Sequence, residues 1–243
     1  MTAALEITVT SPVVSLRNPV YRGVQVGLPC PPPSTVGGFL ASAAGGWRRM
    51  PVHTRFAFTF AAEGSGVDLE TFHPLDARGT ASIPAPQDRE FLADAVLKIW
   101  LTEDLDLWER ALRRPVWPLR FGRSQDLASA RTSRVDLAPG TGAQGHALVP
   151  EELTTAGTKM RLPTAISEDR SRIRWDAYRY AKTGTAVSQP PVAAGYVTSS
   201  GQAVVFLPPT HPDLVSGLCV LRARWTGYGR RAAYGPATGT ASC

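Results

Sequence analysis

Hydrophobic patterns mark four segments in the first half of the chain as strands, from the alternation of a half-buried strand at residues 5–10 to the apolar run of a buried strand at 95–101. The second segment places Phe56, Phe58 and Phe60 on one face of its strand. Such a row of rings can stack on single-stranded bases, but we interpret it as part of a core beneath helices. The strand patterns cover residues 5–10, 54–60, 95–101 and 131–137.

Two segments between these strands have helical periodicity. Residues 104–113 place Leu105, Trp108 and Leu112 on one face of an amphipathic helix. An earlier helix is indicated by apolar side chains at helical spacing, namely Val36, Phe39, Leu40 and Ala43. The order strand, helix, strand, strand, helix, strand predicts an α+β, ferredoxin-like domain over residues 1–137, which is also the fold of RNA-recognition (RRM) domains. The fold alone does not determine the function.

The first helix lies in a stretch rich in proline and glycine, residues 29–46. Prolines stop a preceding strand, so Ser34 or Thr35 is expected to be the helix N-cap, and Gly45 a C-terminal stop. The free N–H groups of such an end suit an anion such as phosphate. Gly37, inside the helix, suggests that something approaches the backbone closely. The alternative, favoured by the helix alone, is a capped core helix with glycines for packing.

A second glycine turn offers phosphate-binding groups. Gly122 allows a positive φ, and Arg120, Arg123 and Ser124 surround it. A loop at residues 11–29 brings Arg17, Tyr21 and Arg22 close to the first helix.

Residues 63–92 are polar and contain few apolar positions. A stretch of this length without periodicity indicates an extended loop, a hairpin arm or a flexible insert.

The second half of the chain is expected to be a smaller β-rich region, residues 146–225, after a glycine-rich linker at 138–145. Strand-like runs occupy residues 172–180 and 202–207, and a helix-like piece occupies 213–218. The tail at 226–243 lacks a core pattern and is expected to be disordered.

The net charge of +6 and the pI of about 9.6 favour a polyanionic partner. Lysine occurs only at Lys98, Lys159 and Lys182, so arginine supplies the other basic groups. Arginine binds phosphate through two bonds and stacks on bases, which suits RNA. A GC-rich genome would produce the same preference for arginine over lysine, so composition alone does not show that the protein binds RNA.

The sequence predicts neither a metal site nor a cofactor. Its 4 histidines and 3 cysteines have no metal-binding spacing. No apolar run reaches the length of a membrane span, and the first residues lack a signal-peptide pattern. We therefore expect a soluble, cytoplasmic protein.

Three blocks together resemble the Cas5 family of CRISPR-associated proteins, particularly its type I-B-like members. The first is Pro31-Pro-Pro-Ser-Thr-Val-Gly-Gly-Phe-Leu, and the second is Leu119-Arg-Phe-Gly-Arg-Ser-Gln-Asp. The third is Met160-Arg-Leu-Pro-Thr with the arginine-rich run at 170–175. The resemblance covers roughly the first 210 residues in order, which is more specific than any single glycine motif.

The resemblance implies a non-catalytic subunit of a type I Cascade effector. Such a subunit grips the five-prime handle of the CRISPR RNA, caps the backbone filament beside the large subunit, and meets target DNA only through the guide. Its hairpin arm, or thumb, would correspond to part of residues 63–92. The expected RNA-binding residues are Tyr21, Arg22, Ser34, Thr35, Gly37, Arg120, Phe121, Gly122, Arg123 and Ser124.

Two alternatives remain open from the sequence. One is a metal-independent endoribonuclease that processes precursor CRISPR RNA, which is what a resemblance to type I-C relatives would imply. Such an enzyme needs an acid and a base near the ribose hydroxyl. The other is a structural subunit whose basic surface is incidental. The candidate acid–base residues share no compact spacing: Tyr21, His53, His73, Lys98 and His146.

Overall fold

The computed structural model describes residues 1–18, 26–72, 85–182 and 191–215. The helices are α1 (Pro33–Ala44) and α2 (Leu105–Arg113), with short 3-10 turns at Trp47–Arg49, Glu151–Leu153 and Pro212–Leu214. The strands are β1 (Thr2–Val14), β2 (Ala57–Phe72), β3 (Ala85–Leu101), β4 (Ser129–Ala143), β5 (Val149–Pro150), β6 (Thr158–Ile166), β7 (Ile173–Tyr180), β8 (Pro191–Val197) and β9 (Ala203–Val204).

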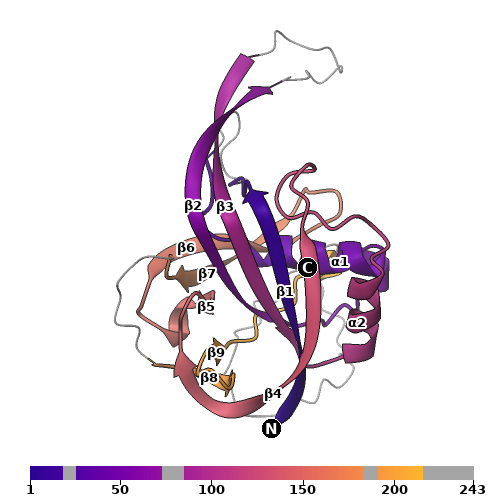
Figure 1. The fold of residues 1–243 in the computed structure, drawn as a ribbon, viewed down its shortest axis with the longest axis vertical. Coiled ribbons are helices and arrows are strands. Elements are labelled where there is room, and N and C mark those ends of the chain that lie inside the picture. The colour runs from indigo at the N-terminus through magenta and orange to yellow at the C-terminus, as the bar shows by residue number, and fades with distance from the viewer. Residues whose placement is uncertain (19–25, 73–84, 183–190, 216–243) are drawn as a thin grey trace, which may run out of the picture.

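The larger sheet has the strand order β2-β3-β1-β4-β8-β9, with antiparallel neighbours (Figure 1). Its first four strands and the two helices follow the predicted order along the chain, so the α+β class is confirmed. Each of these strands is longer than its pattern indicated. In the centre of the sheet, Ile7 of β1 lies opposite Ile99 of β3 and Thr132 of β4.

The helices pack on this sheet through one continuous core. Val36 and Leu40 of α1 and Trp108 of α2 belong to the same buried cluster as Ile7 and Ile99. Leu112 is also buried, and Leu105 is half-buried against the cluster, as the amphipathic pattern predicted. The same cluster contains the three phenylalanines predicted for the core, Phe56, Phe58 and Phe60.

The polar stretch at 63–92 forms a hairpin arm. β2 and β3 stay paired from Ala57 opposite Trp100 out to Phe72 opposite Ala85. The ribbon shows this pair leaving the sheet and projecting well beyond the rest of the protein (Figure 1). Of the three possibilities that the sequence allowed, the hairpin arm is therefore correct for the described part of the segment.

The predicted linker at 138–145 is wrong over most of its length. Residues 138–143 continue β4 and pair with β8, with a register shift between Gly140 and Gly142. A Cβ atom on Gly142 would lie 2.7 Å from the backbone nitrogen of Ala203. Gly142 therefore allows a neighbouring backbone to approach closely, and the second half of the chain continues the first sheet.

A second sheet, with the order β5-β7-β6, packs against the same core. The hydroxyl of Tyr180 donates to the carbonyl of Phe60 at 2.8 Å, and the amide of Leu207 donates to the carbonyl of Phe56 at 2.9 Å. The run predicted at 172–180 corresponds to β7, whereas only two residues of 202–207 form a strand. In the described part of the 213–218 segment there is a 3-10 turn, and the predicted tail lies outside the described residues.

The ends of α1 differ in how well the sequence predicted them. Gly45 is the C-terminal stop, with φ 98°, and its amide donates to the carbonyls of Ala41 and Ser42. The N-cap is Pro32, without a side-chain cap, so the prediction of Ser34 or Thr35 as N-cap is wrong. Proline is favoured in the first turn because its φ is already helical and its missing N–H has no intrahelical partner there.

The group that closely approaches the backbone of Gly37 is a side chain of this protein, Thr210. A Cβ atom on Gly37 would overlap the hydroxyl of Thr210 and lie 3.0 Å from its Cβ. At Gly38 the nearest atom to such a Cβ belongs to Trp47, at an ordinary 3.8 Å. Adjacent glycines of one helix therefore differ sharply in the space around them.

We expect Gly37→Ala to destabilise the protein and Gly38→Ala to stabilise it. Both substitutions gain about 0.5–1 kcal/mol of helix propensity, but only the first overpacks a core contact, which costs about 1–3 kcal/mol. Urea unfolding of both variants measures the difference. In a Thr210→Ala background, the penalty at Gly37 should shrink; an undiminished penalty would contradict the contact.

Candidate nucleic-acid interface

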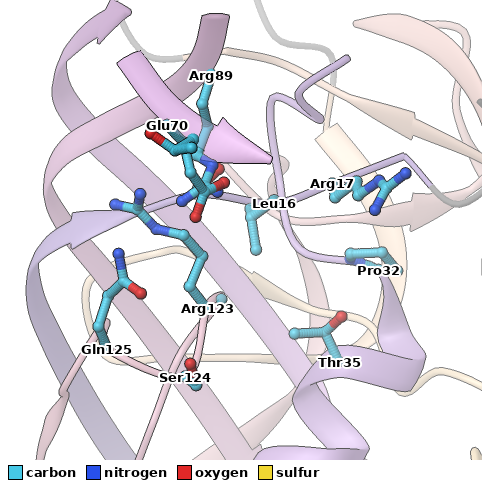
Figure 2. A pocket seen from close by; sticks show the side chains of 12 residues that line it. Leu16, Arg17, Pro32, Thr35, Glu70, Arg89, Arg123, Ser124 and Gln125 are labelled. Atoms are coloured by element: carbon cyan, nitrogen blue, oxygen red, sulfur yellow. The ribbon is translucent and has the colours of Figure 1, made fainter. Parts of the chain in front are cut away.

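A cavity of about 590 Å³ lies at the base of the arm. Four segments far apart in sequence line it: the residues after β1, the start of α1, the facing arm strands, and the loop at 122–125. Figure 2 shows Arg17, Arg89 and Arg123 around this space, with Thr35 below them on α1. A volume between about 300 and 1,000 Å³ is usual for sites that take a small ligand or one unit of a polymer.

The loop at 122–125 is the tip of a tight turn. The amide of Phe121 donates to the carbonyl of Asp126 at 2.9 Å, and the amide of Ala128 donates to the carbonyl of Leu119 at 3.0 Å. Gly122 has φ 106°, as predicted, and a Cβ atom on it would lie 2.9 Å from the carbonyl oxygen of Ser15. Glycine is therefore required both by the backbone conformation and by the neighbouring chain.

Asp126 holds this loop against the end of β1. Its buried carboxylate accepts hydrogen bonds from the amide of Ser15 at 3.1 Å and from the amide of Arg123 at 3.0 Å. It also accepts from Nε of Arg123, at 3.0 and 3.1 Å to its two oxygens. A buried carboxylate is stable only when such partners compensate for its lost hydration.

Two guanidinium groups at the cavity keep unused donors. Arg89 is 5% exposed and pairs with Glu70 across the arm, and Arg123 lies 3.9 Å from Asp68 in addition to its bonds with Asp126. The Nη1 atoms of Arg89 and Arg123 are both buried without a hydrogen-bond partner. Burial, and then the neighbouring Arg123 cation, lower the pKa of Arg89. An anion in the cavity would satisfy both donors and relieve the repulsion.

The N-terminus of α1 opens on the same cavity. Pro32 and Thr35 line it, and Pro33 has no N–H, so Ser34 carries the first free amide of the helix. The partial positive charge at this end adds to that of the arginines.

The structure brings part of the predicted RNA-binding set together. Thr35, Gly122, Arg123 and Ser124 line the cavity, and Ser34 is next to it in the helix without lining it. The predicted loop and helix end therefore belong to one place in the fold.

Other members of the predicted set lie elsewhere. Gly37 is buried against Thr210, and Phe121 is 1% exposed in the core, where its ring contacts Phe39 and Phe60. Neither residue is available to RNA. Arg120 is exposed but does not line the cavity. Tyr21 and Arg22 lie outside the described residues.

Sequence reasoning missed Arg89 and Gln125, and it placed Arg17 near the helix without assigning it to the site. Arg89 is set between polar neighbours in the arm, and no periodic pattern marks it as buried. Its pairing with Glu70 follows only from the register of β2 and β3. Gln125 directly follows the predicted Arg120–Ser124 loop, so extending that motif by one residue would have found it.

The described acid–base candidates do not converge on this cavity. His53 is exposed, Lys98 lies on the sheet 3.9 Å from Glu6, and Nδ1 of His146 is 3.0 Å from the carbonyl of Ala181. Tyr21 and His73 lie outside the described residues. Within the described ranges there is no cluster of three or more potential metal ligands, and no helix has the length and hydrophobicity to cross a membrane.

The fold and cavity define an antiparallel α+β protein with a basic cleft where a hairpin arm leaves the sheet. The model of the family described as CRISPR-associated protein (Cas_Cas5) matches residues 4–189. The chain therefore belongs to the Cas5 family, as its motifs indicated, while the type I-B subtype stays a prediction.

Solved structures share this fold. A chain of a "CRISPR RNA-guided surveillance complex" has a TM-score of 0.54 and 18% identity, over 83% of this chain and 94% of that one. A CRISPR protein from Archaeoglobus fulgidus has a TM-score of 0.50 and 13% identity, over 86% of this chain and 100% of that one. Among curated proteins, no sequence match is found.

We expect Asp126→Ala to destabilise the protein by about 3–5 kcal/mol, because Arg123 and the amide of Ser15 would lose a buried partner. The midpoint of urea unfolding measures this loss. Glu103→Gln, which removes an exposed carboxylate, is the control and should change stability by less than about 0.5 kcal/mol. Equal stability of the two variants would refute the central role of Asp126.

Proposed function

We propose that this protein is a non-catalytic subunit of a type I CRISPR effector and binds the five-prime handle of the CRISPR RNA in the cavity at the arm base. One observation carries the proposal: the buried Arg89 and the half-buried Arg123 each have an Nη1 atom without a hydrogen-bond partner, and both lie beside a helix N-terminus in a single cleft. Because the chain belongs to the Cas5 family, CRISPR RNA is the nucleic acid that we expect this cleft to bind.

The cleft suits a strand with a bend in its backbone. Arg89 and Arg123 would bind one or two phosphates, while the exposed Ser124 and Gln125 offer a hydroxyl and an amide to a neighbouring base or ribose. Phosphate contacts position an RNA strand, and edge contacts identify it. The arm beside the cleft would separate the handle from the guide nucleotides.

The proposal includes a ferredoxin-like fold and a position of the subunit at one end of the filament. Strands β2-β3-β1-β4 with two helices have the order of a ferredoxin-like, RRM-type domain, and β8 and β9 extend its sheet. Large apolar side chains remain exposed on the arm at Val67 and Leu69 and on the turn at Leu127. Such positions are suited to contacts with backbone subunits and the large subunit at one end of the filament.

We expect Ser124→Asp to weaken binding of a repeat-derived handle RNA about tenfold at about 0.15 M salt, because it adds a negative charge beside the phosphates. Fluorescence anisotropy of labelled RNA measures the affinity. Ser133→Asp places the same charge on an exposed position of β4 away from the cavity and should bind within about twofold of the wild type. If both variants lost affinity equally, the charge of the whole protein, and not this cleft, would account for binding.

We expect no specific cleavage when the protein is incubated with a precursor repeat transcript in EDTA, because the described acid–base candidates do not line the cleft. Denaturing gels of end-labelled transcript test this. A single cut at the base of the repeat, lost in a His146→Ala or Lys98→Ala variant, would instead establish the endoribonuclease. A scrambled handle that bound as tightly as the true one would favour a structural subunit with an incidental basic surface.

A further inference from the structure

A second cavity, of about 480 Å³, lies where α1 meets α2. Ala44, Leu107 and Ala111 form its apolar part, and Arg49 and Arg110 line it as well. We call these five residues the helical groove. It is formed where the C-terminal end of α1 meets the middle of α2, so both helices and the 3-10 turn at Trp47–Arg49 contribute to it.

The groove is separate from the cavity at the arm base, which we call the RNA cleft. Thr35, in the first turn of α1, lines the cleft, whereas Ala44, the last residue of α1, lines the groove. A helix of 12 residues is about 18 Å long, so the two openings lie at opposite ends of α1. A molecule can therefore occupy the groove while the cleft holds RNA.

Within the described part of the chain, no acidic side chain compensates the positive charge of the groove. Arg49 and Arg110 are exposed, and neither makes an ion pair with any described residue. The acidic side chains of α2 are engaged elsewhere: Asp106 and Glu109 both pair with Arg134 of β4. Three further exposed arginines, at positions 48, 113 and 114, flank the same helix ends.

The surface beside the groove is apolar. The amide of Val116 donates to the carbonyl of Ala43 at 3.1 Å, and its side chain packs over Gly45. This contact ties the segment after α2 to the end of α1. Val116 and Trp117 remain 62% and 58% exposed there. Tryptophan and arginine are both enriched at the centres of protein interfaces.

We infer that the helical groove is a docking site for an acidic, amphipathic segment of a partner protein. An aliphatic side chain of that segment would enter between Leu107 and Ala111, and carboxylates on either side would pair with Arg49 and Arg110. The positive charge of the groove matches a negatively charged partner. The apolar floor favours a protein over a nucleic acid, because a nucleic-acid backbone would leave that floor unfilled.

The inference does not depend on handle binding, and a peptide experiment on the full chain tests it. The probe is a labelled helical peptide of about 18 residues with leucine on one face and glutamate on the others. A second peptide of equal charge has serine in place of each leucine, and a duplex DNA of about 18 base pairs represents nucleic acid. Binding is measured by fluorescence anisotropy at about 0.15 M salt.

The leucine peptide should bind at least about tenfold tighter than the serine peptide, and Arg49→Gln with Arg110→Gln should remove about tenfold. The matched control, Arg131→Gln with Arg161→Gln, removes the same charge from exposed positions outside the groove and should stay within about twofold. The groove variant should also bind handle RNA as the wild type does.

Four results would overturn the inference. Equal binding of the serine peptide would show that charge alone attracts the probe. Tighter binding of the DNA duplex, lost in the groove variant, would identify a nucleic-acid site. An equal loss in the control variant, or loss of handle RNA in the groove variant, would show that the groove is not a separate site.

Discussion

The carboxylate of Asp126 joins the segment after β1 to the loop at 122–125. It holds the amide of Ser15 after β1, the amide of Arg123 in the loop, and the guanidinium of the same arginine. Because the carboxylate is buried, its charge must be compensated by these donors, which sets the position of the loop relative to the sheet. The orientation of Arg123 follows from this, and so does the position of its Nη1 atom, which has no hydrogen-bond partner and lies 3.9 Å from Asp68.

The arm depends on the same sheet for its position. β2 begins in the core, where Phe58 and Phe60 are buried, and β3 ends there; the two strands leave the body without a change of register. Beyond Gly64 the side chains become mostly polar. At the rim of the cleft, Arg89 lies opposite Asp68 and pairs diagonally with Glu70 across the two strands. A continuous hydrogen-bonded ladder resists bending, so the cleft and the arm form one preorganised surface.

Helix α1 connects the two functional faces that we propose. Its N-terminal turn contributes to the RNA cleft, its C-terminal end contributes to the helical groove, and Gly37 in its middle seats it against Thr210. The helix is buried along most of its length, so its position cannot change at one end without affecting the other. Sites at both ends of such an element suit a subunit that must hold RNA and a neighbouring protein at the same time.

By itself, the sequence determined the elements and one stretch of the site. Periodicity located the two helices and the first four strands, because alternation and helical spacing are local properties of the chain. The need for a positive φ at Gly122 was equally local. Tertiary structure decided the rest: Pro32 and not Ser34 caps α1, Phe121 turns into the core, and Gly142 admits a neighbouring strand. It also placed Arg89 and Arg123 in one cleft, since the contact of residues far apart in sequence depends on strand register and burial, which no local pattern records.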